Sequence, residues 1–152
     1  MNKKLIVAIL VIIILLVIIG FTDLSQFYNS QNQINVGNDT FILPDGFHEG
    51  TPKNEYTNIT NGYDTIFLKE CGADNITKYT KQYIKNKQNN NTSVHMKKFT
   101  VNDTLAYKAS LDNNPNAVRY WFNYNDKVYT IYSLNANNNT DKIVKDIIRS
   151  IN

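Results

Sequence analysis

The first 21 residues carry a hydrophobic pattern that differs from the rest of the chain. Every side chain from Leu5 to Ile19 is apolar, and Gly20 and Phe21 extend the run to 17 residues. A helix of that length is about 25 Å long, close to the roughly 30 Å hydrocarbon core of a bilayer. The pattern therefore predicts a single N-terminal transmembrane helix within residues 1–21.

Two interpretations of this segment compete, a retained signal-anchor and a cleaved signal peptide. Cleavage requires small residues at positions −3 and −1 of the cut, and Ile18/Gly20 or Gly20/Thr22 fit that rule badly. We therefore expect a retained signal-anchor in the cell membrane, passing through it once. Because Lys3 and Lys4 precede the apolar run, the positive-inside rule leaves the N-terminus cytoplasmic and the C-terminal domain extracellular.

Beyond the anchor the pattern changes twice. Residues 22–38 are polar and rich in Asn and Gln, which is typical of a tether. In residues 39–152 the apolar positions alternate between period 2 and period 3.6, which indicates both strands and helices. The predicted organisation is an anchor at 1–21, a polar tether at 22–38 and one extracytoplasmic domain at 39–152.

Turn residues divide the domain into extended segments. Phe41-Ile42-Leu43 ends at the turn tripeptide Pro44-Asp45-Gly46. Asn61-Gly62 predicts a type I′ hairpin, since this dipeptide takes the positive φ values that the turn needs. Asn102-Asp103 and Asn125-Asp126 read as short turns, and residues 112–116 as a longer one. The predicted strands are 41–43, 56–60, 63–70, 94–101, 104–111, 118–124 and 128–134.

Two segments have helical spacing instead. The apolar positions of residues 76–84 recur at intervals of three and four, and Asp74 or Asn75 can cap that helix. Residues 143–151 show the same spacing, with a cap within 139–141. The element order β-β-β-α-β-β-β-β-α predicts an α+β fold, a mainly antiparallel β-sheet with two amphipathic helices packed on one face.

A two-residue turn at Asn125-Asp126 decides which residues of its two strands share a face. It pairs Tyr124 with Lys127, Phe122 with Tyr129 and Tyr120 with Ile131. That face is apolar, and we expect it beneath the helices. The other face carries Arg119, Trp121 and Tyr132, residue types that dominate protein interfaces, and it predicts a binding surface. The alternative is an ordinary solvated sheet face with aromatic cross-strand pairs.

Charge argues against a nucleic-acid partner. The chain has 16 Lys and Arg residues against 13 Asp and Glu, and two of the lysines belong to the anchor, so the domain is nearly neutral. Residues 78–98 hold six lysines without arginines or stacking motifs. That segment is either a solvated face or a contact for anionic lipid headgroups or an acidic wall polymer.

Residues able to carry chemistry are few. Cys71 is the single cysteine, so it is a buried structural residue, an intermolecular disulfide partner or, ranked last, a nucleophile paired with His48 or His95. Asp45, His48 and Glu49 lie within five residues but match no metal signature. We therefore expect no catalytic residues, no metal and no cofactor.

The segment F-I-L-P-D-G-F at residues 41–47 resembles the F-x-(I/L)-P-x-G-aromatic start of PsbP/Mog1-like domains. The closing helix, ending at residues 147–151, is similar to theirs, as is the order of elements over 39–152. The chain is also similar to small membrane-anchored proteins of methanogenic archaea. The resemblance implies an accessory or binding role, because members of the group are mostly non-enzymatic and share no catalytic residues.

The sequence thus predicts a membrane-anchored extracytoplasmic accessory or binding module without catalytic activity. Its partners are the membrane, through residues 5–21, and an unknown protein or cell-envelope component. The alternative is a small-molecule or glycan sensor on the aromatic sheet face. An enzyme is the third hypothesis and ranks far behind the other two.

Overall fold

The elements of the domain run from β1 to α3 between Gln33 and Arg149. A computed structural model describes residues 13–14, 32–73 and 75–151, and residues 33–152 form one compact unit. The strands are β1 (Gln33–Val36), β2 (Asp39–Ile42), β3 (His48–Glu49), β4 (Thr57–Thr60), β5 (Thr65–Gly72), β6 (Val94–Val101), β7 (Thr104–Leu111), β8 (Asn114–Tyr124) and β9 (Lys127–Ser133). The helices are α2 (Ile76–Gln88) and α3 (Thr140–Arg149).

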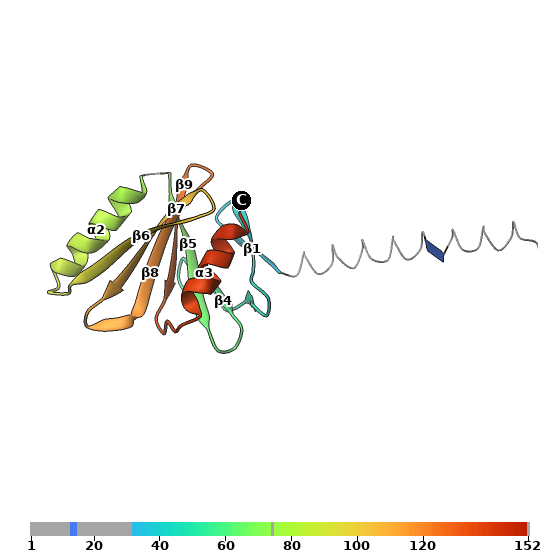
Figure 1. Cartoon of the computed structure of the whole chain (residues 1–152), viewed down its shortest axis with the longest axis horizontal. Coiled ribbons are helices and arrows are strands. Elements are labelled where there is room, and N and C mark those ends of the chain that lie inside the picture. The colour runs from blue at the N-terminus through green and yellow to red at the C-terminus, as the bar shows by residue number, and fades with distance from the viewer. Residues whose placement is uncertain (1–12, 15–31, 74, 152) are drawn as a thin grey trace, which may run out of the picture. The chain divides into compact units, whose positions relative to one another are not determined.

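Seven of these strands form one sheet in the order β3-β4-β5-β9-β8-β7-β6. Figure 1 shows this sheet together with α2 and α3. Every neighbouring pair in it is antiparallel. Strands β1 and β2 make a separate antiparallel hairpin. The predicted α+β class, with a mainly antiparallel sheet and two helices, is confirmed for the described residues.

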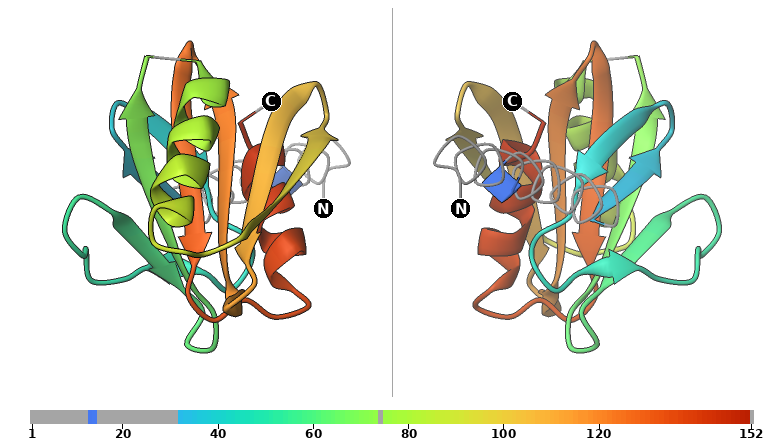
Figure 2. Two further views of the ribbon diagram at one scale, coloured as in Figure 1. Left: turned by 90° about the vertical axis from the view of Figure 1, so that its left-hand side faces the viewer. Right: turned by 90° about the vertical axis from the view of Figure 1, so that its right-hand side faces the viewer.

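The two helices cover opposite faces of the sheet (Figure 2). Helix α3 buries its apolar stripe against the face that carries Tyr120 and Phe122. Helix α2 lies on the other face, where Ile76 packs with Trp121 and Val128. The prediction that both helices pack on one face is therefore wrong.

The connection from β5 to β6 explains why α2 takes the second face. Four antiparallel steps separate these strands in the sheet, so β5 and β6 run parallel and α2 crosses the strands between them. The face that such a crossover covers follows from its handedness, which local hydrophobic spacing does not encode. The signal in the sequence was the mostly apolar composition of residues 120–122 and 128–131. The structure buries both runs without a gap, as in strands covered on both faces.

Helix α3 is held by the stripe that the sequence predicts. Its buried apolar residues are Ile143, Val144, Ile147 and Ile148. Burying a side chain of this size stabilises the fold by about 1.5–3 kcal/mol before the cost of ordering it. Helix α2 buries only Ile76 and Thr80, so its attachment depends on the partly buried tyrosines beside them. The predicted cap of α2 is confirmed, because the Asn75 side chain accepts a hydrogen bond from the Thr77 N–H at 2.8 Å.

The β1–β2 hairpin corrects the predicted tether. Residues 33–36 were assigned to the tether at 22–38, yet Ile34 and Val36 are 3% and 2% exposed and belong to the core on the α3 side. Ile34 pairs with Phe41 across the hairpin. Two apolar residues in a polar stretch gave too short an alternation to predict a strand. The domain therefore begins at Gln33 rather than at residue 39.

The remaining predictions for the N-terminal residues lie almost wholly outside the described residues. Residues 22–31 of the predicted tether lie outside the described residues, as does the predicted anchor at 1–21 apart from Ile13 and Ile14. Among the residues that are described, no helix has both the length and the apolar character needed to cross a membrane. The anchor therefore stays a prediction.

The turns divide into confirmed and corrected ones. Asn125 and Asp126 have φ values of 47° and 58°, and the predicted register of β8 on β9 is confirmed.

The type I′ prediction at Asn61-Gly62 is wrong. Four residues, 61–64, join β4 to β5, and the Asn61 side-chain oxygen accepts the N–H groups of Tyr63 and Asp64 at 3.0 and 2.7 Å. The asparagine side chain thus forms a wider loop than the dipeptide rule supposes.

The turn predicted at residues 112–116 is shorter than expected. Strand β8 already begins at Asn114, which pairs with Leu111. The register then shifts, because the next pair is Ser110 with Val118. Residues 115–117 therefore form a bulge in β8.

A polar cluster fixes the β1–β2 hairpin to the sheet. The Asp39 carboxylate accepts hydrogen bonds from the Tyr129 hydroxyl and from the Asn125 amide, the latter at 2.7 Å. Lys127 Nζ lies 3.3 Å from Asp39 Oδ2 and 3.0 Å from Glu70 Oε2. The hydrogen bond from Tyr129, followed by that from Asn125, lowers the pKa of Asp39. Burial, followed by the hydrogen bond to Asp39, raises the pKa of Tyr129.

A second polar cluster fixes the start of α3. Asp141 accepts hydrogen bonds from Lys108 Nζ at 2.6 Å and from the Tyr120 hydroxyl. Burial acts to raise the pKa of Asp141, but the hydrogen bonds from Lys108 and Tyr120 outweigh it, and the pKa is lowered. Both carboxylates therefore stabilise the fold in their ionised form.

Alanine at Gly37 tests the first cluster. Gly37 and Gly46 have φ values of 65° and 80°, but a Cβ at Gly37 would lie 1.9 Å from Glu70 Oε2, whereas one at Gly46 meets nothing within 4 Å. We expect Gly37→Ala to lower the free energy of unfolding by about 2–4 kcal/mol and Gly46→Ala by only about 1 kcal/mol. Urea unfolding of both variants measures the difference, and equal values would contradict the contact with Glu70.

Acid should weaken the fold through Asp39 and Asp141. Their pKa values are lowered in the folded state from an ordinary value of 3.8. The stability they contribute is complete above that value and is lost as the pH falls through the folded-state pKa values. In urea unfolding between about pH 7 and about pH 2, Asp39→Asn combined with Asp141→Asn should flatten the decline. The exposed Asp103→Asn should keep the wild-type decline, and an unchanged decline in the double variant would contradict the assignment.

Candidate functional site

The three residues predicted as a binding surface lie together on the α2 face of the sheet. Arg119 on β8 is directly opposite Tyr132 on β9, and Trp121 is directly opposite Thr130. The alternation of β8 puts Arg119 and Trp121 on the same side. The register that the sequence predicts therefore brings these side chains together.

Trp121 is nevertheless not part of an open surface. Its side chain is 3% exposed, and the Tyr83 ring of α2 lies against it at a centroid distance of 5.0 Å and an interplanar angle of 65°. Ile76, Ala109 and Val128 belong to the same buried cluster. The prediction of an open aromatic face is wrong at this residue, because α2 covers it. Trp121 holds the helix to the sheet.

Arg119 occupies the margin of α2, between two tyrosine rings. Its Cζ atom lies 5.0 Å from the ring centroid of Tyr132 and 5.5 Å from that of Tyr83. Its Nη1 donates a hydrogen bond to the Tyr56 hydroxyl at 3.4 Å. Among the described residues no carboxylate lies within 4 Å of the guanidinium. The guanidinium is thus held by cation–π contacts and keeps an uncompensated charge.

The tyrosines around Arg119 are held in turn. Tyr132 stacks on Phe67 with ring centroids 4.6 Å apart and an interplanar angle of 11°, and meets Tyr56 edge-on at 4.8 Å. Burial raises the pKa of both Tyr83 and Tyr132, with Arg119 opposing the shift. Both hydroxyls are therefore protonated at neutral pH, and the charge of this region comes from its cations.

Two hollows adjoin at Arg119, and we call them together the Arg119 groove. One has a volume of about 250 Å³ and is lined by Tyr56, Lys69, Cys71, Tyr79, Gln82, Tyr83, Asn86, Arg119, Trp121 and Thr130. The other has a volume of about 300 Å³ and is lined by Tyr83, Lys87, Leu111, Ala117, Val118, Arg119, Tyr132, Ser133 and Leu134. Both linings contain Tyr83 and Arg119, and neither contains Asp or Glu. The groove is therefore basic.

Two lysines extend the charge of the groove. Lys69, in the first hollow, pairs with Glu55, whose side chain is 78% exposed. Lys87, in the second hollow, lies over the Tyr83 ring at 5.6 Å, and no ion pair joins it to a carboxylate in the described part of the chain. Sequence reasoning identified Arg119 and Tyr132, and Lys87 only as one of the six lysines of residues 78–98, but it missed Tyr83, Tyr56 and Lys69. The only feature of the sequence that pointed to these residues was their aromatic or basic character, because the segments that carry them come together only in the fold.

Cys71 lies in the first hollow as a half-buried free thiol. Burial raises its pKa, although Lys69 and Arg119 act in the opposite direction. No histidine lines the hollow. His48 is on the edge strand β3, and His95 on β6 contacts Asp112. The thiol therefore stays protonated at neutral pH and lacks the base that a nucleophilic cysteine requires.

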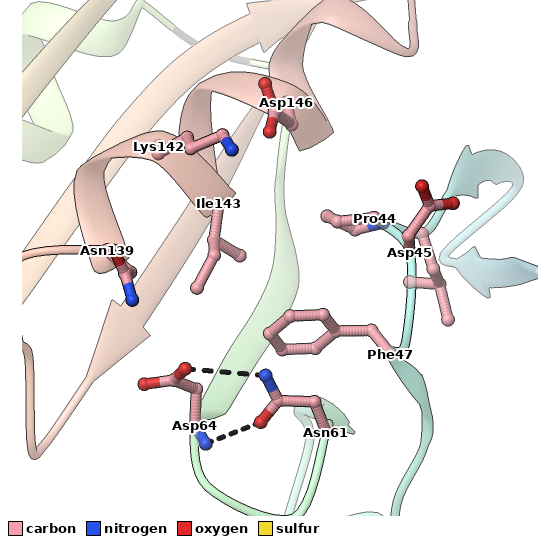
Figure 3. Close-up of a pocket in the computed structure, with 10 residues that line it drawn as sticks. Pro44, Asp45, Phe47, Asn61, Asp64, Asn139, Lys142, Ile143 and Asp146 are labelled. Atoms are coloured by element: carbon pink, nitrogen blue, oxygen red, sulfur yellow. Dashed lines mark hydrogen bonds between the residues drawn. The ribbon is translucent and has the colours of Figure 1, made fainter.

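A larger hollow of about 500 Å³ opens between the loop after β2, the β4–β5 loop and the start of α3. Phe47 and Ile143 point toward one another across it (Figure 3). Two of the three carboxylates that line it have partners: Asp64 is bonded to the Asn61 amide at 3.4 Å and Asp146 to Arg149 at 2.7 Å. Asp45 lines it, whereas His48 and Glu49 do not. Nowhere in the described ranges do three His, Cys, Asp or Glu side chains converge as a metal site requires.

The chain matched no family model and none of the curated proteins with which it was compared. The resemblance to PsbP/Mog1-like domains therefore stays a prediction. The geometry of the Arg119 groove is accordingly the basis for assigning a function.

Truncating Trp121 tests its structural role. We expect Trp121→Ala to lower the free energy of unfolding by about 3–5 kcal/mol, because the substitution leaves a large cavity under α2. The matched control is Tyr63→Ala, which removes an aromatic side chain that is 97% exposed and should change stability by about 0.5 kcal/mol or less. Urea unfolding followed by far-ultraviolet circular dichroism measures both, and similar values would contradict the buried position of Trp121.

Proposed function

We propose that the chain is a membrane-anchored extracytoplasmic binding module without catalytic activity, which contacts a protein or cell-envelope partner through the Arg119 groove. The observation that carries this proposal is the Arg119 guanidinium, fixed between Tyr83 and Tyr132 without a carboxylate partner among the described residues. Arginine and tyrosine are the residue types that most often dominate binding energy at interfaces. The predicted anchor is the basis for placing the domain at the outer side of the membrane. The resemblance of residues 41–47 to PsbP/Mog1-like domains also implies an accessory or binding role.

Preorganisation supports binding at this place. The guanidinium already contacts the rings of Tyr83 and Tyr132 and its Nη1 is already bonded to Tyr56, so little side-chain entropy is lost when a partner arrives. Mobile surface arginines lack this advantage. Catalysis has weaker support, because the thiol in the groove is protonated and has no histidine beside it.

A glycan sensor on the same face has less support than a partner-binding module. Sugar recognition by aromatic residues uses a ring face that is open to the ligand, and Trp121 is covered by α2. The faces of Tyr83 and Tyr132 contact Arg119 instead. The groove thus offers a fixed cation with hydroxyls around it, which suits an acidic group on a partner.

Crosslinking in intact host cells, followed by affinity purification of the full-length chain, tests the proposal. We expect a stoichiometric envelope or membrane partner with the wild type and roughly a tenfold or greater loss with Arg119→Gln, because the partner's acidic group is then left unpaired. The control is Lys98→Gln, which removes an exposed charge of β6 outside the groove and should retain the partner. Equal recovery with Arg119→Gln would contradict this surface. Absence of any partner with the wild type would contradict the function and favour the small-molecule sensor.

A further inference from the structure

We propose that the ligand of the Arg119 groove is an acidic peptide segment, an extended stretch of a protein partner that carries several Asp or Glu side chains. This inference rests on the proposed function and specifies its partner. The two adjoining hollows contribute Arg119, Lys69 and Lys87 and no acidic residue. Each hollow thus combines its own lysine with the shared arginine, and carboxylates repeated along a chain are the complement of such an arrangement.

The guanidinium presents the geometry that a carboxylate needs. Its Cζ atom lies 5.5 Å from the Tyr83 ring centroid and 5.0 Å from that of Tyr132, and a guanidinium held against aromatic rings keeps its in-plane N–H groups for hydrogen bonds. Nη1 already donates to Tyr56, and the remaining N–H groups have no acceptor among the hydrogen bonds found in the described residues. A carboxylate accepts two parallel N–H bonds from such a fork.

Glu55 shows how a carboxylate sits at the edge of the groove. It contacts Lys69, which lines the first hollow, and its own side chain is largely exposed. An incoming glutamate can therefore replace Glu55 on Lys69 without unfolding anything. Lys87 needs no such exchange, since its ammonium lies over the Tyr83 ring and forms no ion pair within the described residues.

The other lining groups favour a peptide over other polyanions. Gln82 and Asn86 are exposed amides of α2 within the first hollow, and amides can both donate to and accept from a peptide backbone. The groove offers an acidic glycan no open aromatic face on which its sugar rings could stack, because α2 covers Trp121.

Fluorescence anisotropy with full-length protein in detergent and a labelled hexaglutamate peptide tests the inference. We expect saturable binding that weakens with salt and that hexaglutamine does not show. Affinity should fall about tenfold or more in Arg119→Gln, less in Arg119→Lys because the charge remains but the fork is lost, and about threefold in Lys87→Gln. Lys98→Gln should bind as the wild type does.

Several outcomes would overturn the inference. These are equal binding of hexaglutamine, tighter binding of inorganic polyphosphate or of oligogalacturonate, or equal effects of Arg119→Gln and Lys98→Gln. Lys87 is on the rim, so its variant keeps the test valid if Arg119→Gln fails to fold, as judged by circular dichroism. If hexaglutamate does not bind while the crosslinked partner still depends on Arg119, the ligand class is wrong and the binding function stands. If crosslinking also becomes independent of Arg119, the function itself is wrong.

Discussion

The register of the β8–β9 hairpin is the constraint on which the rest of this structure depends. Two consecutive residues with positive φ, Asn125 and Asp126, make a tight turn whose twist matches that of the paired strands. Because side chains alternate with period two, this turn assigns every residue of both strands to a face. A slip of one residue would exchange Tyr120 for Trp121 beneath α3 and disrupt both cores at once.

Both faces of this hairpin are buried, and the two cores differ in character. The α3 side collects aliphatic side chains from the helix and from the β1–β2 hairpin around Tyr120, Phe122 and Tyr129. The α2 side has a small buried cluster built on Trp121, with tyrosines at its margin. Arg119 lies where this smaller core ends, and its guanidinium contacts the rings of Tyr83 and Tyr132. The same alternation that buries Trp121 thus puts Arg119 at the edge of the helix.

Sequence reasoning succeeded where a local rule decides the structure. Strands β6 and β7, the Asn75 cap and the register at Asn125-Asp126 depend on residues close together in the chain, and all agree with prediction. It failed where distant segments decide. Strand β1 forms because Ile34 and Val36 pack into the core on the α3 side. The face that α2 covers depends on a crossover between β5 and β6, which lie four places apart in the sheet. The groove falls in the second class, since the crossover of α2 brings Tyr83 to Arg119 and the pairing of β4, β5 and β9 brings Tyr56 to it.

The position of α2 couples the stability of the domain to the proposed site. This helix buries few apolar residues of its own, and Tyr83 both covers Trp121 and forms one wall around Arg119. A ligand held jointly by Arg119 of the sheet and by Lys87 or Gln82 of the helix would therefore add contacts across the weaker of the two cores. Since binding to the folded state alone stabilises it by mass action, occupancy of the groove would strengthen the attachment of α2 in particular. The same geometry explains why a basic groove persists without internal carboxylates, because packing against Tyr83 and Tyr132 holds Arg119 in place of an ion pair.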